Sequence, residues 1–238
     1  MFKIEYTASG QPKNSGLYNP EYDHDSCGTG FISRIDAEPV HSIIEKGIQV
    51  LINLEHRGAI GGDKATGDGA GLCIQIPDLF FRQQVKSKGI KLPESGSYAV
   101  GMVFLPFAEK LRESCKKAFE RIVNEEGCEF ITWRKVPLNN KNLGDLAKST
   151  QPFIEQLFIS RGKISQERFE LKLYVIRRRI ENKIGAWKNY DTSQFYIASL
   201  SSRTLVYKGL LTGTQIPIFY PDLNDDSLKS AYALIHQR

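Results

Sequence analysis

The sequence predicts an α+β protein in which helices cover an antiparallel sheet, and three observations lead to this fold class. Apolar residues recur at helical spacing in three long stretches. Strand-like segments lie between them, without the strict β-α-β alternation that is typical of a parallel sheet. The polar turn Ser201-Ser202-Arg203 separates two further strand-like segments and predicts a hairpin.

Composition indicates an ordinary globular protein. The 238 residues, 41% apolar and 25% charged, can bury a sizeable core in one large domain or two small ones. A net charge of +5 without a dense basic cluster gives no indication of nucleic-acid binding. The most apolar stretch, 98–108, is too short to span a bilayer, so we expect no membrane partner. Four cysteines without CxxC or metal-ligand spacing predict no metal site, and the cytoplasm as compartment.

The amino-terminal part of the sequence predicts a leader, a short strand and a helix, in that order. Residues 1–26 are rich in Gly, Pro, Asn and Ser and lack a sustained apolar period, which predicts an extended or disordered leader. We expect a short strand over 27–33. Apolar spacing predicts a helix over 41–56, which Gly58 is placed to end. Arg57 then lies at the carboxyl end of that helix, where the helix dipole favours a cation.

The glycine-rich stretch 61–71 is not a phosphate-binding loop, because it lacks the Gly-Lys-Ser/Thr ending and a strand-like segment, 72–76, follows it. We expect a tight turn that uses glycine at positive φ, with Asp68 orienting groups rather than taking part in catalysis. Further helices are expected over 79–88, 111–123 and 165–184, the last with Ser165 as its cap, and strands over 98–105, 130–136, 152–160, 194–200 and 204–207.

Cys27 is the candidate nucleophile. It follows a stretch that looks dispensable, which suggests a cysteine that becomes the first residue after processing. A terminal cysteine carries its own base, since a free α-amine with a pKa of about 7.7–8.0 can accept the proton of a thiol, whose ordinary pKa is about 8.5. Position alone instead favours a small buried side chain at the start of a strand, which is the commoner fate of a free cysteine.

A series of short motifs gives Cys27 a context. They include Asp23-His24-Asp25-Ser26-Cys27-Gly28, Leu54-Glu55-His56-Arg57-Gly58-Ala59, Thr66-Gly67-Asp68-Gly69-Ala70-Gly71, Lys172-Leu173-Tyr174-Val175-Ile176-Arg177-Arg178-Arg179 and Phe219-Tyr220-Pro221-Asp222-Leu223. In these motifs, taken in order over nearly its whole length, the chain resembles the class II glutamine amidotransferase domain of the glutamate synthase large subunit. Members of this family are N-terminal-nucleophile hydrolases.

The resemblance implies an αββα four-layer sandwich, incomplete at its C-terminus, with a propeptide over 1–26 and the amidotransferase domain over 27–238. It implies that Cys27 attacks the side-chain amide of L-glutamine, forming a thioester and releasing ammonia and then glutamate. It implies that Arg57 helps to form the glutaminase pocket and that Arg238 binds the substrate carboxylate. Ammonia would then be transferred to 2-oxoglutarate.

The resemblance implies no cofactor in this segment, and FMN and an iron–sulfur cluster in the full-length parent enzyme. The expected partners are the downstream synthase domains and a small electron-donating subunit. The family's Asn and Gly of the oxyanion hole belong to a segment beyond Arg238, and Gln237 stands where serine is usual. Because each oxyanion donor contributes about 10²–10³ in rate, we expect the 238-residue chain alone to be inactive.

Two alternatives stay open. The first is another N-terminal-cysteine amide hydrolase with a different substrate, which assays with asparagine, acyl amides and glutamine would distinguish. The second is a truncated, catalytically inactive fragment, which broad and non-cooperative unfolding would support.

Overall fold

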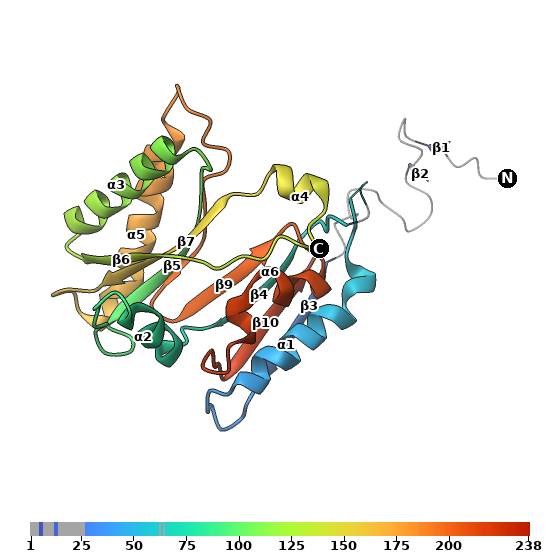
Figure 1. The fold of residues 1–238 in the computed structure, drawn as a ribbon, viewed down its shortest axis with the longest axis horizontal. Coiled ribbons are helices and arrows are strands. Elements are labelled where there is room, and N and C mark those ends of the chain that lie inside the picture. Colours follow the sequence, from blue (N-terminus) through green and yellow to red (C-terminus); the bar gives the residue numbers. More distant parts are fainter. Residues whose placement is uncertain (1–4, 7–11, 14–26, 62, 64) are drawn as a thin grey trace.

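The computed structural model describes residues 5–6, 12–13, 27–61, 63 and 65–238, and its fold is shown in Figure 1. The described part of the predicted leader is a two-stranded antiparallel pair, β1 (Glu5–Tyr6) with β2 (Pro12–Lys13). The rest of the leader, including the predicted cleavage position at Ser26, lies outside the described residues. The remaining strands form two antiparallel sheets of four strands each.

The first sheet carries the candidate nucleophile at its edge. Its strands lie in the order β3 (Gly28–Ser33), β10 (Tyr232–Gln237), β4 (Ala70–Gln75) and β9 (Thr204–Gly209). Helix α1 (His41–Asn53) packs on one face, where alternate strand residues such as Leu72, Ile74 and Ile235 are fully buried. This alternation follows from the two-residue period of side chains along a strand.

The second sheet lies between the first sheet and two long helices. Its strands lie in the order β6 (Glu129–Lys135), β7 (Phe153–Ser160), β5 (Tyr98–Leu105) and β8 (Tyr196–Ser201). The helices α3 (Glu109–Glu125) and α5 (Gln166–Gly185) share one apolar cluster with this sheet, and it includes Cys115 of α3. The arginines 177–179 lie on the solvated side of α5 and form ion pairs with nearby glutamates.

Short helical elements fill the space beside the two sheets. They are α2 (Asp78–Lys86), α4 (Asp145–Ser149), η3 (Gly213–Gln215), α6 (Ile216–Phe219) and η4 (Pro221–Asn224). A single apolar cluster runs from α1 through the first sheet to α2, α6 and the near face of the second sheet. Figure 1 shows the resulting arrangement, with α3 and α5 at one end, the sheets in the middle and α1 at the other end. Among the described residues, none of the helices is long and apolar enough to cross a membrane.

The predicted end of the first helix is wrong by one turn. Helix α1 ends at Asn53, and the chain continues through Leu54 into the 3₁₀ turn η2 (Glu55–Arg57), where the Arg57 amide donates to the Leu54 carbonyl at 2.8 Å. Gly58 was expected to end this helix, but with φ −87° and ψ 145° it is extended and follows the separate turn η2. Its lack of a side chain makes room for Gln237, whose Nε2 would lie 2.4 Å from a Cβ at position 58.

The predicted hairpin around residues 201–203 is also wrong. Strands β8 and β9 do flank the turn, but β8 pairs with β5 while β9 pairs with β4 in the other sheet. Glu170 of α5 explains the divergence, because its carboxylate accepts hydrogen bonds from the Ser202 amide at 2.7 Å and from the Ser201 hydroxyl. Ser165 occupies the N-cap position of α5 as predicted, although its side chain makes no capping hydrogen bond.

Candidate functional site

The antiparallel pairing of β3 with β10 brings the two ends of the 27–238 segment together. Gly28, the first residue of β3, pairs with Gln237, the last residue of β10. The half-buried Cys27 precedes Gly28, and Arg238 follows Gln237. A cysteine and an arginine that are far apart in the sequence therefore lie at the same end of the first sheet.

Arg57 reaches this place from the end of α1. A Cβ at position 28 would lie 3.1 Å from the Arg57 Cβ and 3.3 Å from the Leu54 Cβ. Glycine at position 28 thus allows the end of the helix to approach the start of the strand, beside Cys27. The side chain of Arg57 is exposed, so its guanidinium is available to a ligand.

Arg238 is held by its backbone between the two sides of a loop. Its amide donates to the Gly69 carbonyl at 2.9 Å, and its carbonyl accepts from the Ala59 amide at 3.0 Å. The Asp68 amide in turn donates to the Ala59 carbonyl at 3.0 Å. The structure therefore brings together the start of β3, Arg57, Asp68 and Arg238. A guanidinium binds a carboxylate through paired N–H donors, so two arginines beside a thiol suit a substrate that carries a carboxylate.

A cavity opens next to Arg238 on the face of the first sheet that lies away from α1. It has a volume of about 590 Å³, and Asp68, Cys73, His236 and Arg238 contribute to its lining. Neither Cys27 nor Arg57 is among the described residues that line it. Because Gly28 is buried on the side of α1, strand alternation directs residue 27 toward the same face as this cavity.

The glycine-rich loop forms a narrow hairpin instead of a phosphate-binding loop. Ile60 and Gly67 form a β-bridge, and the Gly61 amide donates to the Thr66 carbonyl at 2.6 Å. Gly69 has φ 152°, which confirms the expected use of positive φ in this stretch. Asp68 is exposed at the base of the hairpin, next to Arg238.

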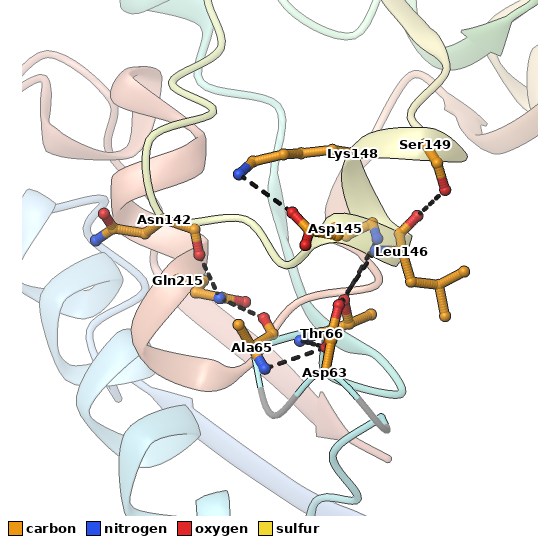
Figure 2. A network of polar contacts seen from close by, with 10 residues as sticks. Asp63, Ala65, Thr66, Asn142, Asp145, Leu146, Lys148, Ser149 and Gln215 are labelled. Carbon is orange, nitrogen blue, oxygen red and sulfur yellow. Dashed lines mark hydrogen bonds and ion pairs between the residues drawn. The ribbon is translucent and has the colours of Figure 1, made fainter.

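Polar contacts anchor the tip of this hairpin, as Figure 2 shows. The Asp63 carboxylate accepts hydrogen bonds from the Thr66 hydroxyl at 2.6 Å, the Thr66 amide at 2.7 Å and the Leu146 amide at 3.1 Å. These bonds, that of the Thr66 hydroxyl above all, lower the pKa of Asp63 to about 2. Asp63 therefore stays ionised throughout the physiological range.

The sequence did not predict that Gln215 belongs to this network. Thr212 and Gln215 form a capping box, a pattern that can be recognised from the spacing of Thr and Gln alone. The additional bonds of Gln215 to Ala65 and Asn142 cannot be recognised in this way, since they join segments far apart in the sequence.

The other cysteines differ from Cys27 in their surroundings. Cys115 and Cys128 are buried in the second apolar cluster, and burial raises the pKa of each thiol to about 11. Burial also raises the pKa of Cys73. At neutral pH all three are thiols and poor nucleophiles. Within the described part of the chain, no group of three or more His, Cys, Asp or Glu residues is arranged to hold a metal ion.

The sequence of this chain matches one protein family and several proteins of known function. The family model of class II glutamine amidotransferases matches residues 27–238. The glutamate synthase [NADPH] large chain of Bacillus subtilis is 44% identical over 98% of this chain and 15% of its own length. That of Azospirillum brasilense is 44% identical over 94% of this chain and 15% of its own length. The glutamate synthase [NADH] of Saccharomyces cerevisiae is 37% identical over 95% of this chain and 11% of its own length. The chain thus spans only about one-seventh or less of these relatives.

Proposed function

This chain belongs to the class II glutamine amidotransferases, and we propose that it is the glutaminase portion of a glutamate synthase. The observation that carries the proposal is the meeting of Cys27, Arg57 and Arg238 at one end of the first sheet. The family match begins at residue 27, which supports a propeptide over 1–26 and an amidotransferase domain over 27–238.

Cys27 performs the covalent chemistry in this proposal. The thiol attacks the side-chain carbonyl carbon of L-glutamine while the freed α-amine of Cys27 takes up its proton. The amine returns the proton to the leaving nitrogen, ammonia departs, and a thioester remains. Water attacks the thioester and releases glutamate, which restores the thiol. Removal of residues 1–26 is required, because the nitrogen of a peptide bond cannot act as this base.

The two arginines bind the substrate. Arg238 pairs with the α-carboxylate of glutamine through its guanidinium, which can donate two parallel hydrogen bonds to a carboxylate. Arg57 forms the wall of the pocket beside Cys27, and Asp68 orients groups at its rim. The cavity next to Arg238 has room for an amino acid side chain and backbone.

The four-layer αββα sandwich is the fold that goes with this function. The position of α1 on one sheet and of α3 and α5 on the other supports it. Exposed apolar side chains also support the four-layer sandwich: on the face of the first sheet away from α1, Phe31 is 65% and Leu234 49% exposed. Apolar side chains of this size on one face indicate that another layer covers them.

In the complete protein, ammonia passes from Cys27 to synthase domains that aminate 2-oxoglutarate. We place FMN and an iron–sulfur cluster in those domains, a small electron-donating subunit among the partners, and the protein in the cytoplasm. The matches to glutamate synthases favour this function over a different amide hydrolase and over a catalytically inactive fragment.

The test is an assay of the protein expressed from its complete gene. We expect the protein to release glutamate and ammonia from glutamine and to leave asparagine unhydrolysed. Its intact mass should correspond to a chain whose first residue is Cys27. Cys27→Ala should abolish the activity, while Cys128→Ala, a change at a cysteine buried in the second apolar cluster, should retain it. Hydrolysis that persists in Cys27→Ala, or activity in a protein that keeps residues 1–26, would refute the proposal.

A further inference from the structure

We propose that Gln215 is a positioning residue for glutamine binding, which holds the hairpin between Arg57 and Asp68 in place without touching the substrate. The inference deepens the proposed function and rests on it. The base of this hairpin adjoins three residues of the candidate site: Arg57 precedes it, Asp68 ends it, and Arg238 bonds to Ala59 and Gly69 at its two sides.

The tip of the hairpin docks on the first turn of α4. The Asp63 carboxylate accepts from the Leu146 amide at 3.1 Å, and the Thr66 hydroxyl accepts from the Ala147 amide at 3.3 Å. The approach is close, since a Cβ at Gly144 would lie 2.2 Å from the Thr66 Oγ1. The tip and the segment around α4 therefore keep one relative position while these bonds exist.

Gln215 joins these two segments to a third. Its side chain is nearly buried, with 8% of the residue exposed. Nε2 donates to the Ala65 carbonyl at 2.7 Å and to the Asn142 carbonyl at 2.6 Å, while Oε1 accepts from the Thr212 amide at 2.9 Å. Figure 2 shows Gln215 between the hairpin and the segment before α4. One amide group thus uses both of its donors and its acceptor to hold three parts of the chain.

The turn that carries Gln215 also contacts the segment before Arg57. The Thr214 hydroxyl donates to the Glu55 carboxylate at 3.4 Å, two residues before Arg57. Gln215 is therefore linked to Arg57 through the contact of Thr214 with η2. It is linked to Asp68 and Arg238 through its bond to Ala65 in the hairpin. Loss of its bonds leaves the Ala65 and Asn142 carbonyls without this donor and releases the tip, so the two guanidinium groups lose their relative placement.

The expected consequence is a binding defect. Arg238 contacts the carboxylate, and Arg57 forms the pocket wall, in the ground state and in the transition state alike, so a change in their placement raises KM and leaves kcat nearly unchanged. For Gln215→Leu we expect KM for glutamine to rise at least about tenfold, with kcat within about threefold of the parent. Gln215→Glu keeps the acceptor but loses both donor bonds, and should behave like Gln215→Leu.

The decisive measurement is the Kd of glutamine by calorimetry, on the protein expressed from its complete gene and carrying Cys27→Ala so that glutamine is not hydrolysed. Adding Gln215→Leu should raise the Kd at least about tenfold. Gln156→Leu is the matched control: Gln156 is also buried and also donates and accepts hydrogen bonds, but its partners are Arg134 and Tyr207. It should leave the Kd unchanged.

Thr66→Val is the second variant, in case Gln215→Leu does not fold. It removes the hydroxyl that links Asp63 to the Ala147 amide while keeping the shape of the side chain. We expect the same rise in Kd. The double variant should have a Kd no higher than that of either single variant, because both changes release the same tip.

The outcomes separate this inference from the proposed function. A parent that binds glutamine while Gln215→Leu or Thr66→Val binds it equally well overturns the inference alone. An equal rise in Gln156→Leu overturns it too, since general destabilisation would then account for the effect. A parent that does not bind glutamine overturns the proposed function and the inference together.

Discussion

Gly67 shows how closely two loops approach beside the candidate site. A Cβ at this position would lie 2.3 Å from the Leu211 carbonyl oxygen and 2.7 Å from the Thr212 nitrogen. Both are backbone atoms, so no rotation of a side chain can relieve the contact. The hairpin and the turn that carries Gln215 can therefore lie together only because residue 67 has no side chain.

We predict that Gly67→Ala destabilises the protein. Overpacking of this kind costs about 1–3 kcal/mol, and for a protein of this size each kcal/mol lowers Tm by about 2–4 °C. Differential scanning calorimetry measures the change. Gly185→Ala is the control, since no atom lies within 4 Å of a Cβ at that position in α5. If Gly67→Ala melts at the same temperature as Gly185→Ala, the close approach does not exist in solution.

A buried ion pair joins the short element η4 to the second sheet. Arg134 of β6 donates to both carboxylate oxygens of Asp222, at 2.7 and 2.8 Å, and to Gln156 at 2.8 Å. The side chains of Arg134 and Asp222 are 7% and 4% exposed. The Tyr207 hydroxyl of β9 also donates to Asp222, and burial raises the pKa of Tyr207 well above its usual range. These bonds connect the two sheets through η4, which has few residues of its own to pack.

We predict that Asp222→Ala is strongly destabilising, by about 3–5 kcal/mol, because it leaves the Arg134 charge buried without a partner. The double variant Arg134→Met, Asp222→Ala should recover part of this loss, since it removes the unpaired charge. Urea unfolding measures both variants. Glu181→Ala on α5 is the comparison: it breaks ion pairs to Arg177 and Arg178 that are partly solvated, and such pairs contribute about 0–1 kcal/mol. A loss for Asp222→Ala no larger than this would contradict the role of the buried pair.

In the molecule as a whole, α1 packs on one face of the first sheet, whereas on the opposite face strands β3 and β10 carry exposed apolar side chains. The other side presents Phe31 and Leu234, and the Phe31 ring lies 6.1 Å from that of Tyr232. The second sheet, by contrast, has apolar side chains buried on both faces, toward α3 and α5 and toward the main cluster. This asymmetry is the physical basis for proposing that a further layer lies on the first sheet.

We predict that Leu234→Lys destabilises the protein expressed from its complete gene. If another layer covers this face, the change removes a buried leucine, which contributes about 1.5–3 kcal/mol, and buries a charge. Ile35→Lys is the control at a fully exposed apolar residue in the turn after β3, and should change stability little. Chemical unfolding of both variants tests the prediction, and equal stabilities would show that the face is open to solvent.

Several parts of this protein could be predicted from local pattern. The helix over 165–184 and the strand over 98–105 match α5 and β5 closely, because the period of apolar residues is a property of each segment alone. The short motifs around Cys27 and Arg57 indicated the family, which the match over residues 27–238 confirms. The resemblance of His236-Gln237-Arg238 to a further motif of the family named Arg238, whose place beside Cys27 and Arg57 follows once β10 pairs with β3.

Only the tertiary structure determined how these segments meet. The turn after β8 has the residues of a hairpin, but Glu170 of α5 binds it and β9 joins the other sheet. Gln215 bonds to Ala65, 150 positions earlier in the sequence, and nothing in the capping box around Gln215 indicates that partner. Local pattern reports the burial of one face of one segment, whereas strand partners and long-range hydrogen bonds depend on all the segments that compete for the same buried groups.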